Sequence, residues 1–146
     1  MEKPSRTGPD PLFVLVVEDE FLFRCEMVEY LRESGCLVLE ASTAKEAVAM
    51  CCDGNPLDVL FTDIQLDGPG CGWDVADALR AVRPAAGVVY VSGNSVDHSR
   101  RVARSLFFNK PYRASDILHA CRDLAQTHRL EVAGRGLQRH DCAIRE

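Results

Sequence analysis

Short apolar runs alternate along the chain with stretches in which apolar residues recur every three or four positions. The runs are rich in β-branched and aromatic residues, which is typical of strands buried on both faces. They cover 12–17, 37–41, 57–62, 88–91 and 106–108. Helical spacing follows over 21–34, 43–53, 73–82 and 115–128. This alternation predicts an α/β fold with a parallel sheet covered by helices on both faces.

Local signals support several of these boundaries. Gly35 stands where the helix predicted over 21–34 should stop, and Pro84 follows the end of the helix predicted over 73–82. Thr43 and Glu46 have the spacing of a capping box. The segment 94–104 is less apolar and rich in arginine. We expect it to form a fifth helix, lightly anchored and the most movable of the set.

Polar residues follow most of the predicted strands. Glu18 and Asp19 come after the first strand, Asp63 after the third, Ser92 after the fourth and Lys110 after the fifth. Since the carboxyl ends of parallel strands meet at one edge, these groups should gather in one crevice. Three acids placed so close repel one another unless a cation joins them. Oxygen ligands favour Mg²⁺ or Mn²⁺ over zinc.

The combination of Glu18-Asp19, Asp63, Ser92-Gly93 and Lys110-Pro111 resembles the receiver domain of bacterial two-component response regulators, similar to the stand-alone chemotaxis type. The resemblance covers residues 12–128. It implies a flavodoxin-like, doubly wound sheet of five parallel strands in the order 2-1-3-4-5, with five helices. It also implies a cis bond before Pro111.

For the site, the resemblance implies that Asp63 accepts a phosphoryl group from a histidine kinase or a histidine phosphotransfer protein. Mg²⁺ would be held by Asp19, Asp63 and the backbone carbonyl of Gln65, with Glu18 acting through water. Lys110 would pair with a phosphoryl oxygen. Such a protein catalyses only its own phosphorylation and dephosphorylation and is not otherwise an enzyme.

The same resemblance implies a switch. Ser92 would move toward the phosphoryl group, and Phe107 would rotate inward to fill the space that Ser92 leaves. Gln65 and Asn94 hold the positions at which the family tunes dephosphorylation. The altered surface would comprise 94–104, 106–108 and 115–128, which an unknown downstream protein would read and through which a homodimer could form.

Composition narrows the function further. The 146 residues carry a net charge of −5, and no basic patch stands out, which argues against nucleic-acid binding. The longest apolar run is far shorter than a membrane span, so we expect a cytoplasmic protein with no membrane contact. Seven cysteines without metal-type spacing are read as buried thiols. Residues 1–11 are expected to be a flexible N-terminus and 129–146 a helix extension or loose tail.

Two alternatives remain beside a single-domain response regulator. A Mg²⁺-dependent phosphatase of haloacid-dehalogenase type also forms an aspartyl phosphate after a strand. It normally has a second aspartate two residues later, where this chain has Gln65. The other alternative is a receiver that is never phosphorylated and serves as an interaction module, against which the intact acids count.

Overall fold

The computed structural model describes residues 10–127. Five strands form one parallel sheet in the order β2-β1-β3-β4-β5, as predicted. They are β1 (Phe13–Val17), β2 (Leu37–Ala41), β3 (Val59–Asp63), β4 (Gly87–Ser92) and β5 (Ser105–Asn109). The expectations for the first nine residues and for the tail from 128 onward lie outside the described residues.

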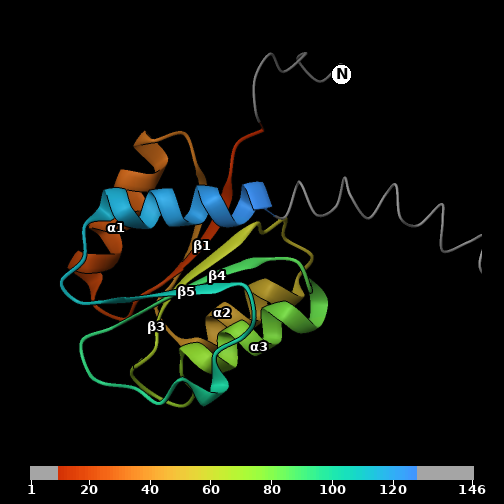
Figure 1. Ribbon diagram of the computed structural model, residues 1–146. Coiled ribbons are helices and arrows are strands. Elements are labelled where there is room, and N and C mark those ends of the chain that lie inside the picture. The colour runs from red at the N-terminus through yellow and green to blue at the C-terminus, as the bar shows by residue number, and fades with distance from the viewer. Residues whose placement is uncertain (1–9, 128–146) are drawn as a thin grey trace, which may run out of the picture.

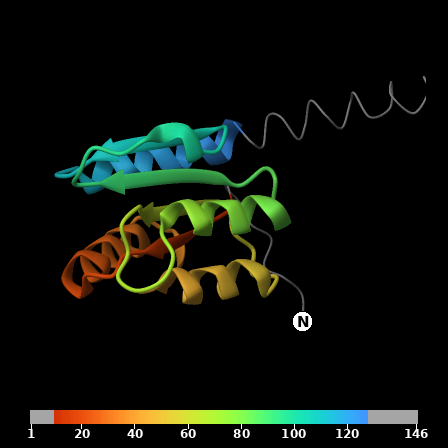
Figure 2. The same cartoon turned by 90° about the horizontal axis from the view of Figure 1, so that it is seen from below.

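Helices cover both faces of this sheet (Figures 1 and 2). They are α1 (Phe21–Glu33), α2 (Ala44–Cys52), α3 (Gly72–Val82) and a C-terminal helix that is described over 114–127. One apolar core joins the sheet to α1 and the C-terminal helix, and a second joins it to α2 and α3. The doubly wound α/β fold expected from the sequence is therefore confirmed.

Burial explains which strands are most apolar. The inner strands β1, β3 and β4 are almost fully buried, whereas the edge strands β2 and β5 are largely half-buried. Trp73 packs on the buried Tyr90 of β4, with ring centroids 4.6 Å apart. No helix within residues 10–127 is long and apolar enough to cross a membrane.

Helix starts follow their capping residues. The Thr43 hydroxyl accepts a hydrogen bond from the Glu46 backbone N–H at 3.1 Å, as the spacing predicts. At α3, the Cys71 backbone N–H donates to the Asp74 carboxylate at 2.9 Å. This second cap pulls the loop after β3 tightly against α3.

The prediction of a helix over 94–104 is wrong. The described segment contains only one short 3₁₀ turn, η1 (His98–Arg100). Its two valines, Val96 and Val102, are only partly buried, so no continuous apolar stripe fastens a helix to the sheet. Polar contacts hold the segment instead: Arg100 lies 2.8 Å from the Asp74 carboxylate and 2.9 Å from that of Asp77.

Candidate functional site

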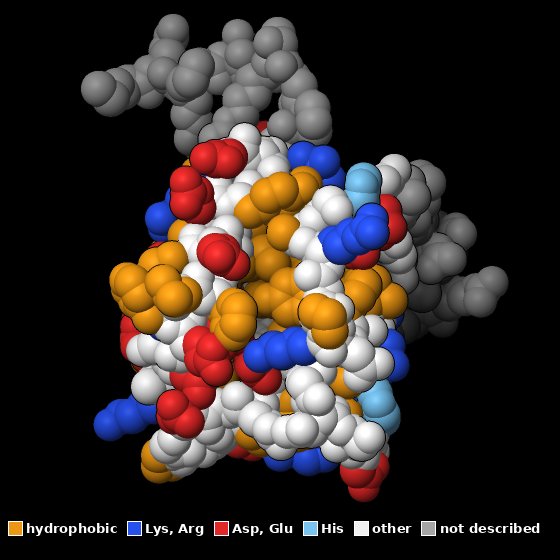
Figure 3. Space-filling view, turned by 90° about the vertical axis from the view of Figure 1, so that its left-hand side faces the viewer, with side chains coloured by type: hydrophobic (Ala, Val, Ile, Leu, Met, Phe, Trp, Pro, Cys, Tyr) orange, Lys and Arg blue, Asp and Glu red, His pale blue; other side chains and the backbone are white. Residues whose placement is uncertain are grey.

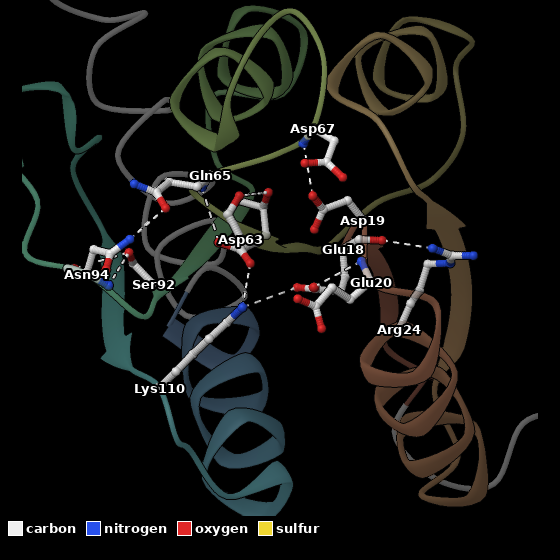
Figure 4. Close-up of polar contacts among 11 residues, drawn as sticks. Glu18, Asp19, Glu20, Arg24, Asp63, Gln65, Asp67, Ser92, Asn94 and Lys110 are labelled. Atoms are coloured by element: carbon white, nitrogen blue, oxygen red, sulfur yellow. Dashed lines mark hydrogen bonds and ion pairs between the residues drawn. The ribbon is translucent and has the colours of Figure 1, made fainter.

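The carboxyl edge of the sheet brings the predicted site residues together (Figure 4). The residues come from the ends of four neighbouring strands: Glu18 and Asp19 after β1, Asp63 on β3, Ser92 on β4 and Lys110 after β5. They line or border a hollow of about 290 Å³ that also includes Gln65, Asp67 and Asn94. The parallel register places these groups at one edge, as the sequence predicted.

Three carboxylates form the acidic part of the site. One oxygen each from Glu18, Asp19 and Asp63 lies within 4.8 Å of the others. Glu18 is only 1% exposed, and its Oε2 has no hydrogen-bond partner. Burial, helped by the nearby Asp63 carboxylate, raises the Glu18 pKa to about 7. Without a bound cation, the negative charges of these three carboxylates therefore repel one another.

The donor set suits a hard divalent cation. Its atoms are carboxylate oxygens, which Mg²⁺ and Mn²⁺ prefer, and a coordinated water could supply the hydrogen bond that the buried Glu18 Oε2 lacks. Asp19 is already oriented, since its Oδ2 accepts a hydrogen bond from the Asp67 backbone N–H at 2.9 Å. The loop after β3 therefore holds one of these acids in place.

Lys110 balances part of this negative charge. Its Nζ donates to Asp63 Oδ2 at 2.5 Å and lies 3.8 Å from Glu18 Oε2. Burial lowers the Lys110 pKa, but the Asp63 and Glu18 carboxylates outweigh that effect, and the pKa is raised overall. The bond between Lys110 and Pro111 is cis, as the resemblance implied. The lysine is thus an ammonium directed at the Asp63 carboxylate.

Asp63 itself is held closely from two sides. It is 5% exposed, and its second oxygen, Oδ1, accepts from the Gln65 backbone N–H at 3.1 Å. Gly72 lies against the Asp63 backbone so closely that a Cβ there would stand 2.4 Å from the Asp63 carbonyl oxygen. Only a glycine fits that position without a shift of the chain.

Ser92 and Asn94 form the opposite wall of the hollow. The Ser92 hydroxyl is buried and exchanges hydrogen bonds of 3.2 Å with the backbone of Asn94. The Asn94 side-chain N–H then donates to Gln65 Oε1 at 2.8 Å. This amide contact spans the mouth of the hollow between the loops after β3 and β4, and no local sequence pattern predicts it.

Phe107, the proposed switch residue, is half-buried on β5. Its ring meets the edge of His98 on η1, with centroids 4.7 Å apart and planes inclined by 75°. The sequence contains no signal for this pairing, because the two residues lie nine positions apart across an irregular segment. Its inward rotation stays a prediction.

A second hollow of about 450 Å³ lies beside the acidic one, between α1 and the start of the C-terminal helix. It is lined mainly by apolar side chains, among them Phe23, Met27 and Tyr112, and Lys110 is at its border. Figure 3 shows this apolar depression with charged groups around it. Phe21, Leu22 and Phe23 are 65%, 73% and 49% exposed. The first turn of α1 is thus an exposed apolar surface next to the site.

Known proteins share this arrangement. The chain is 32% identical over 114 residues to the transcriptional regulatory protein PdtaR of Mycobacterium tuberculosis, a match that covers 75% of this chain and 55% of PdtaR. The chain therefore spans about half the length of that curated relative.

Solved structures agree on the fold. A response regulator receiver protein from Sinorhizobium medicae superposes with a TM-score of 0.78 at 27% identity, over 82% of this chain and 98% of that one. A CheY-like receiver domain from Methanospirillum hungatei gives 0.75 at 20% identity, over 84% and 99%, and so supports the fold alone.

The sequence profile of one family accounts for most of the described chain. Residues 14–122 match the response regulator receiver domain, a span that contains the acids, Ser92 and Lys110. Receiver domains typically act as phosphoacceptor signalling modules rather than as enzymes, and they generally take phosphate from histidine kinases. This protein belongs to the response regulator receiver domain family.

Proposed function

We propose that Asp63 accepts a phosphoryl group from the phosphohistidine of a kinase or phosphotransfer protein. A carboxylate oxygen of Asp63 would form the new bond to phosphorus as the bond to the histidine nitrogen breaks, leaving an acyl phosphate. The observation that carries this proposal is the buried acid cluster in which Lys110 Nζ lies 2.5 Å from Asp63 Oδ2. That ammonium is in place to pair with a phosphoryl oxygen.

Asp19, Asp63 and the Gln65 carbonyl would hold Mg²⁺ or Mn²⁺, and Glu18 would act through a coordinated water. When bound, the cation supplies positive charge that offsets the phosphoryl oxygens. Three closely spaced carboxylates and the buried Glu18 Oε2, which accepts no hydrogen bond, support this assignment.

We further propose that Ser92 and Phe107 carry the response to phosphorylation. The buried Ser92 hydroxyl is bonded only locally to Asn94 in the described structure, so its movement would break two hydrogen bonds of 3.2 Å. Gln65 and Asn94, which meet at the mouth of the hollow, would tune the loss of the phosphoryl group. The signal would pass to a downstream protein, or to a second copy of the chain, through 94–109 and the C-terminal helix.

A phosphodonor must bring its phosphohistidine to the open side of the acidic hollow. The exposed Phe23 of α1 borders that side, with its ring centre 5.8 Å from Lys110 Nζ, which supports α1 as part of the donor contact. We place this reaction in the cytoplasm, where donors of this kind act.

The decisive experiment measures the intact mass of the full chain after incubation with Mg²⁺ and acetyl phosphate. We expect a phosphoryl adduct that EDTA prevents and that Asp63→Asn abolishes. Asp67→Asn is the matched control, because this neighbouring acid meets Asp19 through its backbone and not through its carboxylate. A wild-type chain that gains no adduct would contradict the proposal, and steady turnover of unrelated phosphate esters would favour a phosphatase instead.

A further inference from the structure

Arg24, on the first turn of α1, makes three contacts just behind the acidic cluster (Figure 4). Its Nη1 donates to the Glu18 backbone carbonyl at 2.9 Å, and its Nε donates to Glu40 Oε1 on β2 at 3.3 Å. The guanidinium carbon also lies 5.5 Å from the centre of the Phe21 ring. The Arg24 side chain is only 13% exposed, although Glu40 is 40% exposed and Phe21 65%, so the guanidinium itself is largely shielded from water.

The carbonyl that Arg24 holds belongs to the peptide between Glu18 and Asp19. Both carboxylates of the β1 loop are attached to the two ends of this peptide, so its orientation sets where they point. The other face of the turn is fixed by the Glu18 N–H, which donates to the Ala41 carbonyl at 3.1 Å. Arg24 therefore connects the acid-bearing peptide to β2 from the side opposite the hollow.

We infer that Arg24 is a positioning residue for cation binding, fixing the Glu18–Asp19 peptide so that both acids face the cation. The inference rests on the proposed function, since it concerns the same site. Hydrogen bonds behind a ligand set commonly determine how well the ligands themselves bind. Arginine suits this task because its planar fork can serve a carbonyl and a carboxylate at once.

The positive charge of Arg24 allows a positioning role to be distinguished from a purely electrostatic one. A guanidinium near a cation site repels the cation, so a purely electrostatic role predicts tighter Mg²⁺ binding when the charge is removed. A positioning role predicts weaker binding. The two explanations thus differ in the sign of the change and not only in its size.

The experiment titrates Mg²⁺ into the full chain by isothermal titration calorimetry and follows urea unfolding in parallel. For Arg24→Gln we expect Mg²⁺ affinity to fall about 10-fold. Arg24→Lys keeps the positive charge but lacks the planar guanidinium, and we expect its affinity for Mg²⁺ to fall as well. Arg32→Gln is the matched control, because Arg32 also ties α1 to β2, donating to the Val38 carbonyl at 3.0 Å, away from the site.

Unchanged or tighter Mg²⁺ binding in Arg24→Gln would overturn the inference, as would an equal loss in Arg32→Gln. Should Arg24→Gln fail to fold, Arg24→Lys decides: wild-type affinity in that variant overturns the positioning role. A wild-type chain that binds no Mg²⁺ would defeat the proposed function as well. Binding that is equal in wild type and variants defeats this inference alone.

Discussion

The two sides of the acidic hollow are built differently. On the β1 side, a buried strand leads into the 13-residue helix α1, and the shielded Arg24 fixes the turn between them. On the β4 side, Ser92 leads into a segment with one 3₁₀ turn, tied to α3 by Arg100, whose side chain is 46% exposed. Exposed ion pairs contribute little to stability. The molecule thus keeps its proposed cation-binding acids on a well-packed support and its proposed switch on a weakly held one.

The largest effect should come from crowding the well-packed junction at which the start of α3 lies against the Asp63 backbone of β3. In Gly72→Ala, the new Cβ would collide with the Asp63 carbonyl, which is backbone and cannot yield without moving Asp63 itself. We expect the free energy of unfolding, measured in urea, to fall by about 3 kcal/mol.

Gly93→Ala is the control on the weakly held side. Its Cβ would meet only the Lys110 Cδ, at an ordinary 3.9 Å, so its unfolding free energy should change by less than about 0.5 kcal/mol. If Gly72→Ala and Gly93→Ala lowered the free energy of unfolding by similar amounts, the proposed contrast between the packed support of the acids and the segment after β4 would be contradicted.

A smaller effect of opposite sign is expected for Glu18→Gln in EDTA. The folded-state pKa of Glu18, about 7, lies above the ordinary value of 4.5, so burial of the charge destabilises the fold increasingly as the pH rises between these values. Urea unfolding at pH 8 should show the variant more stable by about 2 kcal/mol, and at pH 4 the two proteins should agree. A variant that is less stable at pH 8 would show that Glu18 supports the fold rather than strains it.

The smallest change in stability is expected for Arg100→Gln. Removing the exposed contacts to Asp74 and Asp77 should leave the midpoint of urea unfolding close to that of the wild type. Amide hydrogen exchange over 95–102 should nevertheless become faster, while exchange in α1 stays the same. Unchanged exchange in the segment would mean that other contacts hold η1 in place.

The strands and the site residues could be predicted because their signals are local. Each strand is a short apolar run, and Asp63, Ser92 and Lys110 stand directly at or after strand ends that the parallel order brings to one edge. The helix expected over 94–104 could not be judged in this way. The spacing of residues in this segment did not show that Val96 and Val102 are too few to pack a helix against the sheet.

The contacts that refine the site were not predictable from the sequence. Arg24 meets Glu40 only because β2 pairs with β1, and Asn94 meets Gln65 only because two loops of different length arrive at the same point. The N–H of Asp67 reaches Asp19 for the same reason. Such pairs depend on three-dimensional loop paths, which no periodicity encodes.

The tilted contact between the Trp73 and Tyr90 rings gives the protein an intrinsic fluorescent reporter. Trp73 is the single tryptophan of the chain, and it lies at the start of α3, directly after the loop that follows Asp63. Its partner Tyr90 also accepts a hydrogen bond from the Val102 N–H at 3.3 Å, which connects the ring pair to the segment after β4. Emission from one native indole can therefore follow both walls of the hollow in real time, without any attached dye.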